Sequence, residues 1–222
     1  DDIHYKGGCL LNENLGWGAT MWAYSSRAPD PALHPETWRE MWLQRLENEP
    51  FLPETWLQHQ TRDAYWQHGS VCEDYSAIKA ATLAVGGWGD AYKNTVPTLV
   101  ENLSAPVKGI NGPWVHKYPH FAVPEPRIGF LQEALRWWDR WLKGIENGAD
   151  QWPNYRAYML QSAPPDASAA ERKGYWVAEQ MPSPNVSWQE LGLGDGTLGD
   201  AAPFRALVST PQTLGASAGE YF

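Results

Sequence analysis

Two short apolar runs that flank a helical pattern constrain the fold of this chain more than any other feature. The first run, residues 82–85 (TLAV), is closed by Gly86 and Gly87, and its continuous apolar character is typical of a strand buried on both faces. Residues 94–102 can form a helix, and residues 106–110 form the second run. Parallel strands need a crossover of this kind between them. The segment therefore predicts a βαβ unit and an α/β fold.

A helical region precedes this unit. Between residues 35 and 66, apolar side chains recur at helical spacing and predict a helical hairpin or a small helical subdomain. Pro53 opens the second of its two segments, as a first-turn proline can. We expect each segment to bury one face, made of Trp38, Met41, Trp42 and Leu46 in the first and of Trp56, Leu57, Ala64 and Tyr65 in the second.

The chain changes character after a third helical pattern. Residues 127–143 carry a broad apolar stripe and are followed by Gly144, a residue favoured just after a helix. After Pro153 the helical signals vanish, and short extended segments at residues 155–160 and 175–178 alternate with turns. This pattern predicts the beginning of an all-β domain. We expect three tryptophans of the third helix to pack against the sheet: Trp137, Trp138 and Trp141.

Charge and apolar content exclude several classes of protein. Of the 222 residues, 26 are acidic and 17 are basic, and the net charge of −9 repels phosphate backbones. The longest apolar run, around residues 80–88, is far shorter than the roughly 20 residues needed to cross a bilayer. We therefore expect no nucleic-acid partner and no membrane span. Because Asp1 is not a methionine and no targeting run follows it, we expect the true N-terminus to lie outside this sequence, and we favour the cytoplasm.

The spacing of cysteine and histidine gives little support to a metal site. Cys9 and Cys72 are too few and too far apart for a disulfide framework or a paired metal motif. His116 and His120 are four residues apart, but Pro119 lies between them and no His-Glu-x-x-His helix surrounds them. We expect neither a bound metal nor a cofactor.

Two ionisable residues follow the predicted strands of the βαβ unit. Asp90 comes after the first strand and His116 after the second. Because the carboxyl ends of parallel strands meet at one edge of a sheet, we expect these side chains to lie side by side. A carboxylate beside an imidazole fixes its tautomer in a Ser-His-Asp triad, and α/β-hydrolases place the acid before the histidine. The pair predicts the acid and base of a hydrolase, with a helix cap or turn residue as the alternative interpretation of Asp90.

Three ordered motifs surround this pair. They are GGWGDAY at residues 86–92, GPWVH at residues 112–116, and a segment from Gly129-Phe130 to RWWDRWLKG that ends at residue 144. Their wording resembles the cocaine esterase-like CocE/NonD hydrolases, which are related to the X-Pro dipeptidyl-peptidases, and the resemblance extends over essentially the whole chain. It implies that Asp90 is the triad acid and that His116 is the general base.

The same resemblance implies that the chain is part of an α/β-hydrolase and is divided into three segments. Residues 1–80 would be a helical cap inserted in the hydrolase domain, and residues 81–152 the C-terminal part of its core. Residues 153–222 would begin a truncated jelly-roll β domain. The nucleophilic serine of the family lies in a Gly-x-Ser-x-Gly elbow before the cap, so it is expected upstream of this chain. The motif around Ser217 follows the acid and base and leaves no room for the helix of an elbow, so we interpret it as a turn.

These features lead to two hypotheses of different kinds. The first is a serine hydrolase that cleaves a small-molecule ester or a peptide, including X-Pro dipeptidyl bonds, with Trp88 and Trp114 lining an acyl or leaving-group pocket. This chain alone would then be inactive. The second is a non-catalytic module whose 14 tryptophans bind a carbohydrate or an apolar ligand. A catalytically inactive relative is a third possibility, and an apolar face on the cap helices would allow a homo-oligomer.

Overall fold

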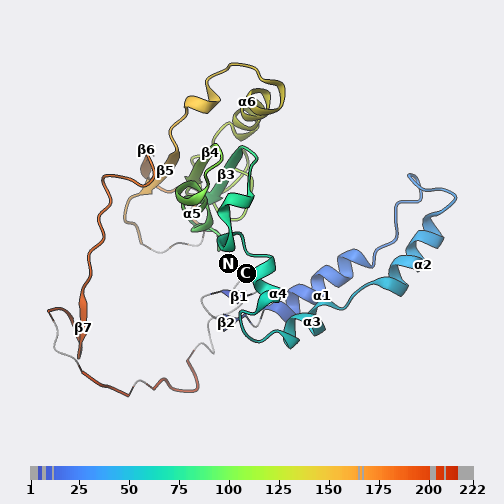
Figure 1. The fold of residues 1–222 in the computed structure, drawn as a ribbon, viewed down its shortest axis with the longest axis horizontal. Coiled ribbons are helices and arrows are strands. Elements are labelled where there is room, and N and C mark those ends of the chain that lie inside the picture. The colour runs from blue at the N-terminus through green and yellow to red at the C-terminus, as the bar shows by residue number, and fades with distance from the viewer. Residues whose placement is uncertain are drawn as a thin grey trace. The chain divides into compact units, whose positions relative to one another are not determined.

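The computed structural model describes residues 5–6, 9–11, 13–164, 166, 168–200, 204–207 and 209–214. The chain forms two compact units, Asp1–Glu73 together with Arg205–Phe222, and Asp74–Phe204. Figure 1 labels the helices and strands of both units. Among the described residues, no helix combines the length and the apolar character needed to cross a membrane.

The first unit is mainly helical. Its elements are an antiparallel pair of β1 (Tyr5–Lys6) and β2 (Cys9–Leu10), four helices, and the 3-10 turn η1 (Val71–Glu73). The helices are α1 (Asn14–Ser25), α2 (Trp38–Asn48), α3 (Leu52–Gln58) and α4 (Ala64–His68). The predicted helical region is therefore present, but it is divided into shorter helices than the sequence pattern indicates.

The core of the first unit is a pair of tryptophans from neighbouring helices. Trp56 of α3 and Trp66 of α4 are buried together, and the indole N–H of Trp66 donates to the backbone carbonyl of His59 at 2.7 Å. The prediction that Leu57 and Tyr65 share this buried face is wrong, since both are exposed. Asp63 begins a new helix by capping α4, so the helical register is not continuous from α3 to α4.

The second unit contains a mixed four-stranded sheet in the order β3-β4-β5-β6. Its strands are β3 (Thr82–Gly87), β4 (Val107–Gly112), β5 (Tyr155–Leu160) and β6 (Gly174–Glu179). The first three strands are parallel, and β6 is antiparallel to β5. The helices α5 (Thr95–Asn102) and α6 (Phe130–Lys143) join β3 to β4 and β4 to β5. The predicted βαβ unit is confirmed, with each strand continuing two residues further than predicted.

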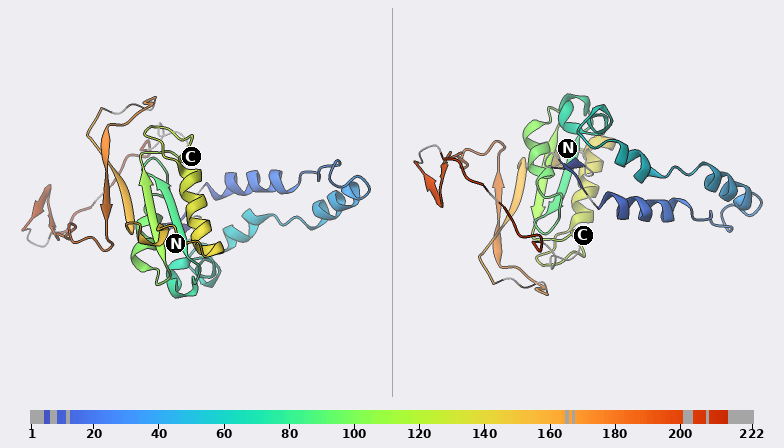
Figure 2. Two further views of the ribbon diagram at one scale, coloured as in Figure 1. Left: turned by 90° about the horizontal axis from the view of Figure 1, so that it is seen from above. Right: turned by 90° about the horizontal axis from the view of Figure 1, so that it is seen from below.

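Side-chain alternation along β3 separates two apolar cores. Ala84 packs with Val96 and Val100 of α5 on one face of the sheet. Leu83 and Val85 belong to the opposite face, which Ile110, Trp114 and Ala122 also occupy. Helix α6 lies along this second face, as both views in Figure 2 show. Because successive residues of a strand point to opposite faces, the single strand β3 contributes side chains to both cores.

The sheet extends past residue 153, where we expected a separate β domain to begin. Tyr155 of β5 pairs with Gly109 of β4 in parallel register, and Leu160 pairs with Gly174 at the start of β6. These two strands therefore belong to the same sheet as β3 and β4. Beyond them lies a short antiparallel hairpin of β7 (Gly192–Gly194) and β8 (Thr197–Gly199). The described residues do not show the packed sheets of a jelly roll.

Helix α6 begins three residues later than predicted and ends as predicted. Gly144 follows it with a φ of 70°, the left-handed conformation that glycine adopts without a Cβ penalty. Trp137 is buried, as expected, but Trp138 is 57% exposed. The expectation that Trp138 packs in the core is therefore wrong, because its side chain lines an open cavity. The remaining elements are the 3-10 turns η2 (Tyr75–Ala77) and η3 (Ala149–Gln151).

Candidate active site

Asp90 lies in the turn that follows β3 and is fixed there by its backbone and side chain. Its backbone N–H donates to the carbonyl of Gly87 at 3.0 Å. Its Oδ1 accepts a hydrogen bond from the backbone N–H of Tyr92 at 2.9 Å. The Asp90 side chain is only 12% exposed. The carboxylate is therefore held with one oxygen in the turn and the other, Oδ2, directed outward.

His116 lies after β4 and meets this second oxygen. Its Nδ1 is 2.8 Å from Asp90 Oδ2. The edge of the Tyr92 ring approaches the imidazole, with ring centroids 5.8 Å apart and the planes at 68°. A carboxylate can only accept here, so Nδ1 carries the proton and Nε2 keeps its lone pair in the neutral ring. With 79% of the side chain exposed, the imidazole is accessible to another reactant.

The two loops that carry Asp90 and His116 approach each other closely. The backbone N–H groups of Trp88 and Gly89 donate to the carbonyls of Gly112 and Trp114, both at 2.9 Å. A Cβ at Gly87 would lie 2.0 Å from the carbonyl oxygen of Trp114, so only glycine permits this approach. The predicted juxtaposition of acid and histidine therefore exists in the structure, and it depends on backbone contacts between the ends of two parallel strands.

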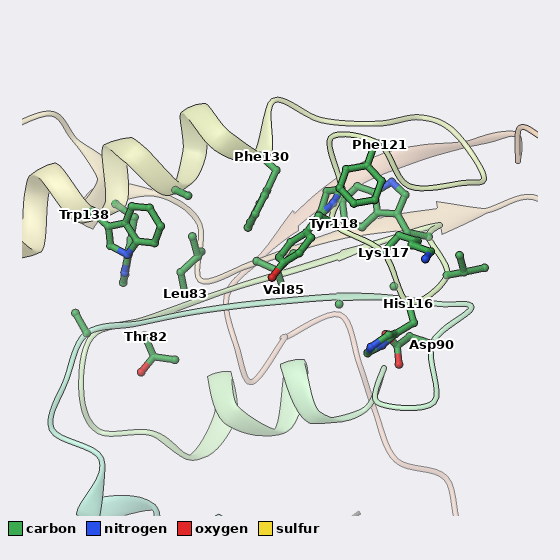
Figure 3. A pocket seen from close by; sticks show the side chains of 18 residues that line it. Thr82, Leu83, Val85, Asp90, His116, Lys117, Tyr118, Phe121, Phe130 and Trp138 are labelled. Atoms are coloured by element: carbon green, nitrogen blue, oxygen red, sulfur yellow. The ribbon is translucent and has the colours of Figure 1, made fainter. Parts of the chain in front are cut away.

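A cavity of about 840 Å³ opens beside the Asp90–His116 pair. Figure 3 shows it between β3, helix α6 and the segment that follows His116, with Tyr118, Phe121 and Phe130 near the pair and Trp138 farther along the helix. Most of its lining is apolar, and Lys117 is the lining residue with a permanent positive charge. The arrangement can place an apolar substrate group within reach of the imidazole.

The described lining of this cavity contains neither serine nor cysteine. Thr82 is its hydroxyl-bearing aliphatic residue, and its Oγ1 lies 3.1 Å from the carbonyl of Ala80. Thr82 begins β3, five residues before Gly87, so about 16 Å of strand separates it from the acid turn. It is therefore too distant to act as the nucleophile. The motif around Ser217 lies outside the described residues.

Trp88 and Trp114, the tryptophans predicted to line a substrate pocket, differ in their relation to the cavity. The Trp88 indole N–H donates to the carbonyl of Tyr158 at 2.6 Å, and Trp88 is not among the residues that line the cavity. Trp114 is among the residues that line the cavity, although it is 1% exposed and its indole N–H donates to the carbonyl of Pro126 at 2.9 Å. A tryptophan after a strand predicts proximity to the loops, but it does not predict the direction in which its indole points.

His120 lies among aromatic rings instead of beside a second metal ligand. Its ring is parallel to Phe130 at a centroid distance of 6.1 Å and contacts Phe121 edge to face at 4.7 Å. Its Nδ1 is buried and has no hydrogen-bond partner among the described residues. Within that part of the chain, no three His, Cys, Asp or Glu side chains gather into a group that could hold a metal.

Sequence reasoning missed the aromatic residues of the cavity and a buried polar pair behind the acid turn. Tyr118, Phe121 and Phe130 line the cavity, yet their positions on an irregular segment and at a helix start carry no periodic signal. Asn111 and Tyr155 form the buried pair. Asn111 lies just past the predicted strand at residues 106–110, so no sequence signal indicated its burial.

Comparison with known proteins identifies the family to which this site belongs. The family model described as X-Pro dipeptidyl-peptidase (S15 family) matches residues 1–118, a span that includes both Asp90 and His116. A crystal structure of a CocE/NonD family hydrolase from Staphylococcus aureus shares the fold, with 16% sequence identity and a TM-score of 0.50. That match covers 74% of this chain and 29% of the other chain.

A second crystal structure of a CocE/NonD family hydrolase from Staphylococcus aureus has 17% identity and a TM-score of 0.49, covering 74% of this chain and 28% of that one. The chain thus spans less than a third of the length of the solved structures that it resembles. No curated protein matches it. Because the family model covers more than half of its residues, the chain belongs to the X-Pro dipeptidyl-peptidase (S15) family of hydrolases.

Proposed function

We propose that this chain carries the acid and the general base of a serine hydrolase that cleaves ester or amide bonds. The observation that carries the proposal is the 2.8 Å contact between Asp90 Oδ2 and His116 Nδ1 at the ends of two adjacent parallel strands. A partly buried carboxylate that holds an exposed imidazole is the arrangement on which a Ser-His-Asp triad depends. Membership of a peptidase family supports the same reaction class.

The proposed mechanism uses the two ring nitrogens of His116 differently. Asp90 accepts the hydrogen bond from Nδ1 and thereby leaves Nε2 free to take the proton of a serine hydroxyl as the serine attacks the substrate carbonyl. The imidazolium that forms is stabilised by the Asp90 carboxylate. His116 then returns the proton to the leaving alcohol or amine, and an acyl-enzyme remains. Water, deprotonated by the same nitrogen, hydrolyses the acyl-enzyme and restores the serine.

We propose that the nucleophilic serine lies upstream of Asp1, in the longer protein of which this sequence is a part. The cavity lining described above offers no serine to His116. Within the described sheet, β3 pairs with β4 on one side and forms the edge of the sheet on the other. Thr82, Leu83 and Val85 of this edge strand line the cavity, so a segment that enters beside β3 would reach the exposed imidazole.

The division into cap, core and β domain is also a proposal. The helical unit Asp1–Glu73 supports an inserted cap that ends near residue 80. The hairpin of β7 and β8 is the part of the described tail that supports entry into a β domain. The substrate class is proposed as a small ester or a peptide, with X-Pro dipeptides included because the matching family is named for them.

The test is hydrolysis by the longer protein. The coding sequence upstream of Asp1 is determined, the complete protein is produced, and hydrolysis of a p-nitrophenyl ester and of an X-Pro p-nitroanilide is measured. We expect activity with at least one of these substrates and labelling of a serine by a fluorophosphonate. Replacing His116 by Ala should lower kcat roughly 10⁴-fold or more, because the general base is lost.

The matched control is His34→Ala, which removes an exposed histidine of the helical unit. It should retain wild-type activity. Unchanged turnover in His116→Ala, or an upstream region without a reactive serine, would overturn the proposal. In the second case, a titration of tryptophan fluorescence with sugars would test the binding-module hypothesis.

A further inference from the structure

Asn111 places a polar amide inside the buried sheet. It lies on β4, is fully buried, and pairs in register with Gly86 of β3 and Ala157 of β5. Burying an amide costs free energy unless its polar atoms find partners. The Nδ2 group donates to the carbonyl of Lys93 at 3.2 Å, and Oδ1 accepts from the hydroxyl of Tyr155 at 3.1 Å. The amide therefore bridges two elements that are distant in sequence.

The carbonyl that Asn111 holds belongs to the turn of the proposed triad acid. The backbone N–H of Lys93 donates to the carbonyl of Asp90 at 3.4 Å, and its Nζ lies 3.5 Å from the same oxygen. The residues from Asp90 to Lys93 thus form one turn whose last carbonyl is anchored to β4. A shift of that carbonyl moves the backbone of Asp90 and, with it, the carboxylate that meets His116.

Gly109 provides space for the Tyr155 ring of this anchor. A Cβ at Gly109 would come within 3.0 Å of the Tyr155 ring, so its absence lets that ring lie against β4. A Cβ at Gly86 would lie at an ordinary contact distance of 3.5 Å from Asn111 Nδ2, and its one tight approach would be to Val96 at 3.0 Å. Burial raises the pKa of Tyr155 to about 12, so its hydroxyl stays protonated and remains a donor to Asn111 over the ordinary pH range.

We propose that Asn111 and Tyr155 are positioning residues: they hold the Asp90 turn in the position that lets Asp90 Oδ2 accept a hydrogen bond from His116 Nδ1. Their catalytic meaning rests on the hydrolase function proposed above. Neither side chain lines the cavity, so both act through the turn. A purely structural role would affect the stability of the sheet without a specific effect on the histidine.

The test uses the 222-residue chain and reads the His116 ring directly. With ¹⁵N-labelled histidine at a pH of about 8, where histidines are ordinarily neutral, two-bond ¹H–¹⁵N correlations identify which ring nitrogen carries the proton. In the wild type we expect His116 in the Nδ1–H form. Asp90→Asn replaces the carboxylate with an amide and defines the signal of a ring without its charged acceptor. Tyr155→Phe removes only the hydroxyl, and Asn111→Val removes the amide while it keeps a residue suited to strands.

The matched control is Tyr158→Phe on the same strand. Tyr158 is also buried, and its hydroxyl donates to the carbonyl of Arg172 at 3.0 Å. We expect Tyr155→Phe and Asn111→Val to move the His116 signals toward those of Asp90→Asn, while Tyr158→Phe keeps the wild-type signals at a similar loss in Tm. Wild-type signals in Tyr155→Phe, or an equal change in Tyr158→Phe, would overturn the proposal. Since the readout does not involve turnover, failure of the hydrolase proposal is detected separately, by the hydrolysis measurement.

Discussion

Gly87 is the residue on which the meeting of the acid and histidine loops depends most directly. Its missing Cβ leaves room for the carbonyl oxygen of Trp114, a backbone atom that cannot rotate away. We therefore expect Gly87→Ala to destabilise the chain by about 1–3 kcal/mol, the usual cost of overpacking, and to disturb the Asp90–His116 hydrogen bond. Urea denaturation measures the first effect, and the His116 ring signals measure the second.

Gly16→Ala provides the comparison for this substitution. Gly16 lies on an exposed part of α1, and a Cβ there would have no heavy atom within 4 Å. Alanine in a helix is favoured over glycine by roughly 0.5–1 kcal/mol, so this variant should be slightly more stable than the wild type. A Gly87→Ala protein as stable as Gly16→Ala would contradict the close approach of the two loops.

The adjacency of Asp90 and His116 could be predicted because it follows from topology. Residues after neighbouring parallel strands meet at one edge whatever their side chains are. The environment of Trp88 and Trp114 could not be predicted in this way, because it depends on which backbone carbonyl each indole N–H finds. Those acceptors, Tyr158 and Pro126, lie 70 and 12 residues away in sequence, and no local pattern indicates them.

Helix α6 shows what apolar periodicity does and does not determine. The stripe predicted the helix and its end at Gly144, but it is wider than the face that the sheet covers. Ala134 and Trp137 are buried, whereas Leu131, Leu135, Trp138 and Leu142 are each more than half exposed. The period of a pattern locates a helical face, while the width of its partner surface decides which residues of that face are covered.

The contrast between buried and exposed residues of α6 predicts unequal effects of substituting its two adjacent tryptophans, Trp137 and Trp138. Trp137→Ala should cost about 3–5 kcal/mol, because it removes a buried side chain that packs against Trp141 and Trp152. Trp138→Ala should cost about 1 kcal/mol or less, because its side chain is 57% exposed. Denaturant unfolding of the two variants gives both values, and similar losses would show that the exposed face of α6 is covered in solution.

The partner of β5 illustrates a limit at the level of strands. The extended pattern at residues 155–160 predicts a strand, and β5 is observed at the same residues. Strand patterns, however, do not name the neighbour to which a strand is hydrogen-bonded. Lys108 helps to decide it here, since its Nζ binds the Asn154 side chain at 3.1 Å just before β5 begins. An interaction over 46 residues is visible only in the folded chain.

At the scale of the whole chain, the apolar cores and the ion pairs of the sheet all lie within the unit Asp74–Phe204. Both apolar cores of the sheet lie between residues 74 and 204. The ion pairs that tie α6 to the rest of this unit are also internal: Arg156 to Glu133 at 2.9 Å and Arg140 to Asp150 at 3.0 Å. The buried tryptophan pair of the helical unit forms a separate cluster. Each unit thus has its own core, as an independently folding domain requires.

We therefore expect Asp74–Phe204, produced alone, to fold and to retain the acid–histidine geometry. Its ¹H–¹⁵N spectrum should be dispersed, and His116 should stay in the Nδ1–H form expected for the whole chain, because Asp90, Asn111 and Tyr155 all remain. The same fragment with Asp90→Asn should have an equally dispersed spectrum, and only the His116 ring signals should change from those of the Nδ1–H form. If the chemical shifts of both fragments are poorly dispersed, the sheet needs the helical unit for stability. A folded unit with a released His116 would mean instead that the geometry of the acid–histidine pair depends on residues outside 74–204.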